Sequence, residues 1–210
     1  IRDRPYFALN ESKLLTYNTA FKLSPPLRSE DDRLAIIEGI QDGTIDAIAS
    51  DHRARSKDTK AQPFSAASVG ASGIETLFSI TLDLVHKKII DINKAISFLT
   101  INPAKIFGID SPSLEEEKVA DFIVFDENEP HTIKQKNLKT SPTPFDGKKI
   151  HGKILATYIN GQVAFMNQIF KNKIITKKLN IKLKINENIN TSKPMSIYGF
   201  TKLAAEMLIE

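Results

Sequence analysis

The feature that most constrains the fold is a short apolar run, TIDAIAS, at residues 44–50. Small and β-branched side chains of this kind are typical of a strand that is covered on both faces, as in a parallel α/β sheet. A helix is predicted just before it, with Ser29 as N-cap, acidic residues in the first turn and Gly43 at the end. Further strands are predicted at 6–9 and 19–24. The first fifty residues therefore favour the α/β fold class.

Beyond residue 50 the sequence predicts a long loop, then helices, then strands. Helices are predicted at 74–87, at 92–99 and up to residue 107, and strands at 118–126 and 153–167. The dipeptide Asn160-Gly161 is a strong signal for a hairpin turn. Three parts are predicted: residues 1–108, a small β subdomain at 109–167, and a basic tail with a terminal helix at 168–210.

Asp51 is the best single candidate for a catalytic or metal-binding residue. It directly follows the predicted parallel strand, and α/β barrels place their active sites at the carboxyl ends of such strands. A carboxylate there can bind a divalent metal ion and accept a proton from metal-bound water. The alternative is that Asp51 caps the following loop or pairs with Arg53 or Arg55. Position alone leaves both interpretations open.

The histidines do not complete a metal site at the level of sequence. In a continued strand, His52 would point to the face opposite Asp51. His86, His131 and His151 are widely separated and lack the HxH or HxxxH spacing that places two imidazoles on one metal ion. Surface positions are predicted for His131 and His151.

Positive charge gathers in two other segments. In the loop after Asp51, Arg55, Lys57 and Lys60 can meet an anionic substrate, and the alternative is a solvated basic loop. Residues 171–184 contain six lysines and no acid. Contact with nucleic acid is the functional interpretation of this tail, but a solvated extension is preferred and no nucleic-acid partner is expected.

Tyr198 and Lys202 show the YxxxK spacing of an acid–base pair. The fold that uses such a pair needs a glycine-rich nucleotide turn far upstream, and no GxGxxG occurs in this sequence. The start of a helix is therefore the preferred interpretation.

Composition excludes several chemistries. The chain has no cysteine, which excludes structural disulfides, thiolate metal ligands and cysteine nucleophiles, and fits a cytoplasmic location. It has no apolar run of about 18 residues, so no membrane association is expected.

Several motifs occur in the order and at the spacing of one known family. They are KLSPPLRSEDDR, ASDH, KAQPFSAASVGASGIETL, TINPAKIFGI, VADFIVFDENEP and TPFDGKKIHGKILATYINGQVAF. Over residues 5–167 the sequence resembles the C-terminal half of a class I dihydroorotase, a metal-dependent amidohydrolase. The resemblance implies the C-terminal part of a (β/α)₈ TIM-type barrel followed by a small β subdomain. It also implies reversible hydrolysis of dihydroorotate to N-carbamoyl-aspartate in pyrimidine biosynthesis.

The resemblance implies roles for individual residues. Asp51 matches the aspartate that ends the eighth barrel strand, a metal ligand and general base. Arg55 matches a histidine that contacts the substrate carboxylate, and an arginine retains the ability to bind a carboxylate. Ser24 matches a substrate-contacting asparagine, and Gly70 follows Val69 where many members have Phe-Gly. Asp51 is thus the expected catalytic and metal-binding residue, and the other three matches are expected to bind substrate.

The sequence also departs from the family pattern. Pro5 stands where the family has a metal-binding histidine, and the other metal ligands of the family lie upstream of the first residue here. The resemblance implies zinc as the cofactor, yet we expect this chain not to bind zinc stably. We therefore expect a truncated dihydroorotase-like protein that is inactive on its own.

Two alternatives follow from the same comparison. A complementing half-barrel from another chain would supply the missing ligands, although Pro5 would still leave one position empty. A non-catalytic scaffold would instead bind a partner such as aspartate transcarbamoylase. The sequence does not decide whether the chain is an enzyme.

Overall fold

The computed structural model describes residues 2–3, 5–109, 113–115, 118–138, 142–168, 170–171 and 197–199. The helical elements are α1 (Pro5–Ala8), η1 (Glu11–Thr16), η2 (Thr19–Phe21), α2 (Glu30–Asp42), α3 (Lys57–Lys60), η3 (Ile74–Thr76), α4 (Leu77–His86), α5 (Ile92–Ser97), α6 (Ile101–Phe107) and η4 (Gln135–Asn137). The strands are β1 (Arg2–Asp3), β2 (Ile48–Ala49), β3 (Phe122–Thr132), β4 (Lys149–Ile159), β5 (Gln162–Met166) and β6 (Ile197–Gly199).

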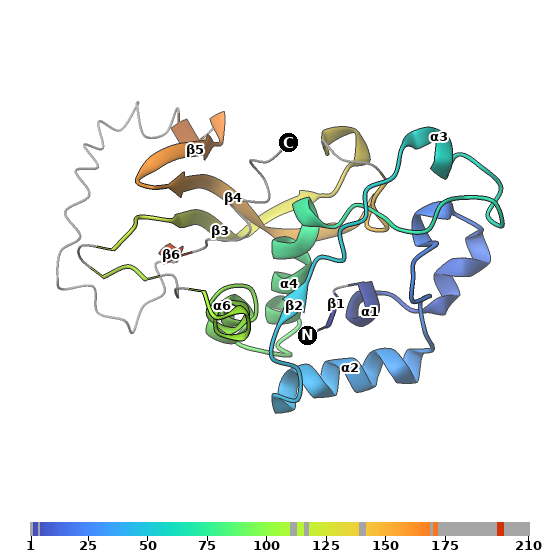
Figure 1. Ribbon diagram of the computed structural model, residues 1–210, viewed down its shortest axis with the longest axis horizontal. Coiled ribbons are helices and arrows are strands. Elements are labelled where there is room, and N and C mark those ends of the chain that lie inside the picture. Colours follow the sequence, from blue (N-terminus) through green and yellow to red (C-terminus); the bar gives the residue numbers. More distant parts are fainter. Residues whose placement is uncertain are drawn as a thin grey trace.

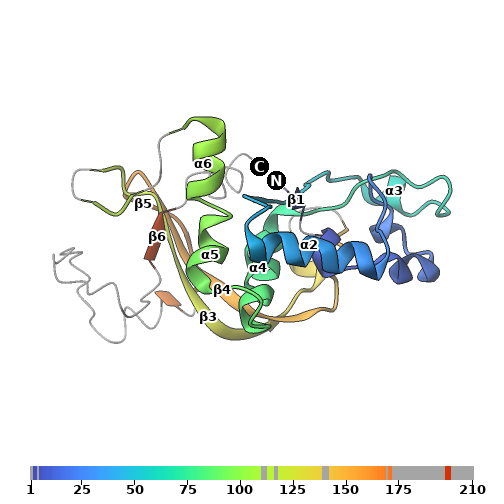
Figure 2. The same cartoon turned by 90° about the horizontal axis from the view of Figure 1, so that it is seen from below.

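The strands form two separate sheets. β1 and β2 pair in parallel, with Arg2 opposite Ile48 and Asp3 opposite Ala49. The larger sheet is antiparallel in the order β5-β4-β3-β6. Figures 1 and 2 show α4 in the middle of the molecule, between the long strands β3 and β4 and the helix α2, with α3 and β5 at opposite ends.

A single hydrophobic core joins the helices to the larger sheet. Its buried members include Ile40 of α2, Leu82 of α4, Ile96 of α5, Ile123 of β3 and Ile150 of β4. The core is therefore continuous across the predicted boundary at residues 108 and 109, and the β subdomain shares its interior with the helical part. The three-part division itself stays a prediction.

The contact between α4 and β4 depends on Gly152. This glycine has a positive φ of 92°, and a Cβ atom there would lie 2.3 Å from Cδ1 of Leu82. The Ser79 hydroxyl donates to the Gly152 carbonyl at 3.0 Å, and the Phe78 and Phe125 rings meet edge to face at 4.7 Å. A larger residue at position 152 would force the Leu82 side chain to shift within the core.

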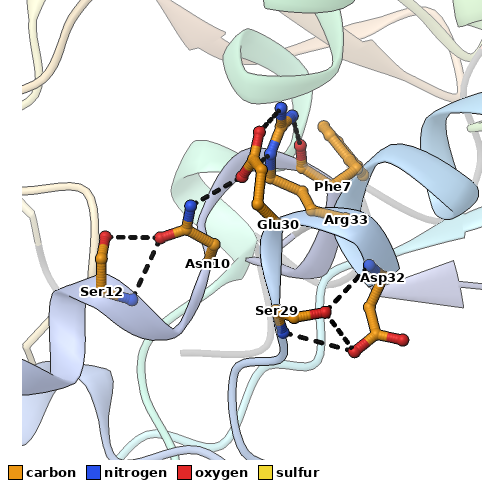
Figure 3. A network of polar contacts seen from close by, with 7 residues as sticks. All are labelled: Phe7, Asn10, Ser12, Ser29, Glu30, Asp32 and Arg33. Atoms are coloured by element: carbon orange, nitrogen blue, oxygen red, sulfur yellow. Dashed lines mark hydrogen bonds and ion pairs between the residues drawn. The ribbon is translucent and has the colours of Figure 1, made fainter.

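The predicted helix after Ser29 is confirmed as α2, which begins with a capping box. The Ser29 hydroxyl accepts from the Asp32 amide at 3.1 Å, and the Asp32 carboxylate accepts from the Ser29 amide at 3.3 Å (Figure 3). Gly43 ends the helix with a φ of 89°. Both ends of α2 are thus specified by local sequence.

A second group of contacts ties α2 to α1. Arg33 forms an ion pair with Glu30 and donates to the Phe7 carbonyl at 3.1 Å, while the Asn10 amide donates to Glu30 at 2.6 Å (Figure 3). The Arg33 guanidinium and the Asn10 amide lower the pKa of Glu30 to about 2. Glu30 is therefore ionised at neutral pH and links both segments.

Two predicted strands are wrong. Residues 6–9 belong largely to the helical turn α1, because Pro5 favours the first position of a helix and the Leu9 amide donates to the Pro5 carbonyl at 2.9 Å. Residues 19–24 begin with the 3₁₀ turn η2, which Asn18 caps by accepting from the Ala20 amide at 2.9 Å. In both segments local hydrogen bonds outweigh the strand propensity of the apolar residues.

The predicted helices at 74–87, 92–99 and up to residue 107 and the predicted strands at 118–126 and 153–167 agree with the structure in type. The predicted strand at 44–50 is confirmed only at Ile48–Ala49. The hairpin turn between β4 and β5 is confirmed, with φ of 49° at Asn160 and 73° at Gly161. In the predicted terminal helix, residues 197–199 form strand β6 instead and pair with β3. The rest of that prediction, including Lys202, lies outside the described residues.

Two histidines that are far apart in sequence meet where α4 ends over the β3–β4 pair, and a third lies on the neighbouring strand. The His86 and His151 rings are 4.8 Å apart, and His131 lies on β3 opposite Ile150. His131 is partly buried rather than on the surface, because its strand runs beneath the end of α4, and its Nδ1 has no hydrogen-bond partner among the described residues. Burial lowers its pKa, and the nearby Lys153 acts in the same direction.

Exchange of Gly152 for alanine tests the close approach of α4 to β4. Gly147→Ala is the matched control, since Gly147 also has a positive φ, 78°, but a Cβ there would meet no described atom within 4 Å. The control is expected to lose about 1 kcal/mol of unfolding free energy from backbone strain. Gly152→Ala is expected to lose about 3 kcal/mol or more from strain and overlap together. Equal losses in urea unfolding would contradict this account.

Acid is expected to weaken the fold through His131. Because its pKa in the folded chain lies below the ordinary 6.5, the unfolded chain takes up the proton first, and stability is lost as pH falls from 6.5 through the folded value. His131→Asn should therefore show a shallower fall in unfolding free energy between pH 7 and pH 5. The difference between the two proteins at pH 8 measures packing alone, and parallel curves would rule out a role for His131.

Candidate active site

Asp51 lies just beyond β2, at the carboxyl end of the parallel pair. Its φ is 45°, a left-handed conformation that is uncommon for residues other than glycine. Its carboxylate lies 3.3 Å from Nε of Arg53, and the side chain of Asp51 is only 10% exposed against 53% for Arg53. The structure therefore shows the ion pair with Arg53 that the sequence left open as the alternative.

His52 connects this strand end to the start of the next helical segment. It forms a parallel bridge with Ala71, and its Nδ1 accepts hydrogen bonds from the amides of Gly73 at 3.1 Å and Ile74 at 3.3 Å. A nitrogen that accepts carries no proton, so the ring proton belongs on Nε2. Through Nδ1, His52 therefore orders the entry to η3 and α4, and this nitrogen is not available to a metal ion.

Gly70 and Arg55 are brought next to the strand end by the loop. Gly70 has a φ of 114°, and a Cβ there would lie 2.8 Å from Cβ of Arg53 and 3.5 Å from Nε of Arg55. Nε of Arg55 donates to the Val69 carbonyl at 2.8 Å. The structure thus packs Gly70 against Arg53 and Arg55, and Arg53 in turn pairs with Asp51.

Ser24 joins the same region through the main chain. It lies between the buried residues Leu23 and Leu27, which pack with Tyr6 and Ala71 in a small second core. Two bonds hold this segment in place: the Tyr6 hydroxyl donates to the Pro25 carbonyl at 2.6 Å, and the Gly70 amide donates to the Lys22 carbonyl at 2.9 Å. The exposed Ser24 therefore stands on a turn anchored to both α1 and the Gly70 loop.

The sequence did not indicate that the side chain of Lys60 is buried. It is only 4% exposed, and its Nζ donates to the carbonyls of Ser68 at 3.0 Å and Gly70 at 2.8 Å. Burial lowers its pKa to about 8, and the charges of Lys22 and Arg55 add to the effect. A lysine in a run of charged residues predicts a solvated side chain, so no local signal distinguishes it from Lys57.

The described residues do not fit a metal ion. No group of three or more His, Asp or Glu side chains capable of holding a metal occurs in the described part of the chain. Asp51 supplies one carboxylate, which Arg53 already neutralises, and Pro5 begins α1 without any side-chain donor. A metal centre would need donors from outside the described residues.

Comparison with known proteins identifies the family of this chain. A model of the amidohydrolase family matches residues 10–164. The chain belongs to the amidohydrolase family. That family is generally metal-dependent.

Two relatives in this family are dihydroorotases. The dihydroorotase of Anaplasma phagocytophilum is 38% identical over 162 residues, which are 76% of this chain and 36% of that protein. The dihydroorotase of Clostridium acetobutylicum is 39% identical over 163 residues, which are 76% of this chain and 38% of that protein. The chain thus spans little more than a third of the length of these relatives, and it is dihydroorotase-like in sequence.

Solved structures show the same fold at lower identity. The L-hydantoinase (dihydropyrimidinase) from Arthrobacter aurescens aligns with a TM-score of 0.73 and 24% identity, covering 78% of this chain and 38% of that one. Dihydropyrimidinase from Brevibacillus agri aligns with a TM-score of 0.71 and 22% identity, covering 79% and 38%. The fold is therefore part of an α/β barrel amidohydrolase, as the sequence predicted. No helix in the described residues is long and apolar enough to cross a membrane.

The comparisons do not test the individual site residues. Gly70 is linked to the segment before Ser24 through Lys22 and to Asp51 through Arg53. The roles of Asp51, Ser24, Arg55 and Gly70 in binding or catalysis stay predictions.

Replacement of His52 tests its structural role. His52→Ala removes the acceptor of two main-chain amides and is expected to lower the unfolding free energy by about 1–3 kcal/mol. His52→Asn is the matched variant, because its amide oxygen can take the place of Nδ1, and it should recover much of the loss. If alanine and asparagine behave alike in denaturant unfolding, the two hydrogen bonds contribute nothing measurable.

Proposed function

We propose that this chain provides the substrate-binding side of a dihydroorotase-like amidohydrolase, with dihydroorotate and N-carbamoyl-aspartate as its ligands in pyrimidine biosynthesis. The observation that carries the proposal is the packing of Gly70 against Arg53 and Arg55 just beyond β2, where Arg53 also pairs with Asp51. The identity of 38% to dihydroorotases over three quarters of the chain supports it.

The ligand chemistry follows from the side chains at this strand end. Arg55 carries a planar guanidinium that can bind a carboxylate through two parallel hydrogen bonds. Gly70 is needed for the close packing of this loop, because a side chain there would collide with Arg53. Ser24 offers a hydroxyl on the anchored turn, where the family pattern has an amide.

Asp51 is the proposed proton acceptor, and its pairing with Arg53 limits that role. Its carboxylate lies 3.3 Å from Nε of Arg53. Arg53 would have to turn away before Asp51 could act as a base. With no fitting set of metal donors in the described residues, we propose that this chain binds its ligand without hydrolysing it unaided.

A second candidate function is that of a non-catalytic dihydroorotase-like scaffold. The Asp51–Arg53 pair favours it, because the pair neutralises the carboxylate that catalysis needs. A complementing half-barrel or aspartate transcarbamoylase is the proposed kind of partner in that case. Ligand binding separates the two candidates, since a scaffold needs none.

Zinc content and turnover should be measured on the same sample. When the 210-residue chain is expressed with zinc, we expect well below one equivalent of bound metal and no hydrolysis of dihydroorotate. One carboxylate in an ion pair is too weak a ligand set to retain zinc. Near-stoichiometric zinc together with turnover would overturn the proposed lack of unaided activity.

Dihydroorotate binding tests the ligand assignment without requiring turnover. Arg55→Gln is expected to weaken binding measured by calorimetry by roughly tenfold or more, since a charge-assisted hydrogen bond contributes about 1.5–3 kcal/mol. Lys57→Gln, an exposed cation of the same loop, is the control and should leave the affinity nearly unchanged. If the unaltered chain does not bind dihydroorotate, the scaffold becomes the better account.

A further inference from the structure

The loop of residues 56–70 is held by cations that point into it. Nζ of Lys60 donates to the Ser68 and Gly70 carbonyls, Nζ of Lys22 donates to the Ser65 carbonyl at 2.7 Å, and Nε of Arg55 donates to the Val69 carbonyl at 2.8 Å. Three positive side chains from different segments therefore converge on main-chain oxygens of this loop.

Main-chain contacts place Lys60 at the centre of the arrangement. The Thr19 hydroxyl donates to the Lys60 carbonyl at 2.5 Å, and the Ser68 amide donates to the Thr59 carbonyl at 3.0 Å. Lys60 thereby joins η2, α3 and the segment that leads to Gly70.

The positive charge at this point lacks a carboxylate among the described residues. Lys22 and Arg55 face Lys60 and repel it, whereas Lys57 and Asp58 of α3 have exposed side chains. None of the ion pairs formed within the described part of the chain includes Lys60. Carbonyl oxygens solvate a buried ammonium only in part, so the closed loop carries an uncompensated cation.

We propose that Lys22, Arg55 and Lys60 form a binding site for a small anion with a carboxylate or phosphate group, whose binding stabilises the closed loop. The anion would lie toward the Lys22 and Arg55 side chains, and Lys60 would act from beneath as a positioning residue. That the natural anion is the ligand of Asp51 rests on the proposed function, whereas anion binding as such does not.

The lowered pKa of Lys60 determines how the stability of the closed loop depends on pH. Its pKa is lowered from 10.5 to about 8, so the closed loop binds the proton less tightly than an open loop does. The destabilising effect is fully present below pH 8 and is relieved as pH rises from 8 toward 10.5. A bound anion favours the ammonium form and removes the same effect at neutral pH.

The test is thermal unfolding of the full chain at pH 7 in inorganic phosphate, compared with chloride at equal ionic strength. Phosphate should raise the unfolding midpoint by about 2–4 °C, which is the shift that a modest gain in unfolding free energy produces in a chain of this length. Lys60→Met should lose most of this phosphate response, and its midpoint in chloride reflects the lost hydrogen bonds to Ser68 and Gly70 as well as the removed charge. Lys57→Met is the matched control from α3 and should respond to phosphate like the unaltered chain.

A second variant and a second ligand complete the test. If Lys60→Met does not fold, Lys22→Met removes an outer cation and should still reduce the phosphate response by about half. Dihydroorotate in place of phosphate then distinguishes the ligand of Asp51 from a free anion. Equal phosphate responses in the unaltered chain and the Lys60 or Lys22 variant would overturn the anion site, whatever the outcome for hydrolysis.

Discussion

The close contact between α4 and β4 at Gly152 is the constraint on which the rest of the structure depends. It brings the helix against the sheet over Phe78 and Phe125 and makes one core out of the barrel portion and the β strands. The same helical segment begins where the amides of Gly73 and Ile74 donate to His52. The position of Asp51, next to His52, is therefore connected through α4 to the packing of the distant sheet.

The charges of Asp51 and of Lys60, in the loop that follows it, are compensated differently. The carboxylate of Asp51 has its counter-ion in Arg53, so the strand end is close to neutral. Lys60, further along the loop, has carbonyl partners and two cations near it. Positive charge without a carboxylate partner among the described residues is therefore found at Lys60 and not at Arg53.

Sequence reasoning succeeded where local signals decide the structure. Ser29 and Gly43 delimit α2, and the turn at Asn160 and Gly161 forms as predicted, because capping and positive φ depend on a few adjacent residues. It failed at 6–9 and 19–24, where apolar residues suggested strands but proline and asparagine start helical turns. The sequence did not predict the burial of Lys60 or the contact of His86 with His151. Residue spacing along the chain does not show which lysine becomes buried or which histidines from different elements come together.

The sequence by itself determined the family, the α/β class and the place of Asp51 at a strand end, because motif order and strand patterning are properties of the chain. Only the tertiary structure decided that Arg53 pairs with Asp51 and that His52 accepts hydrogen bonds from two main-chain amides. It also decided that the cations of three segments converge on one loop. The physical reason is that charge pairing and burial depend on distances between segments, which folding sets and local sequence does not.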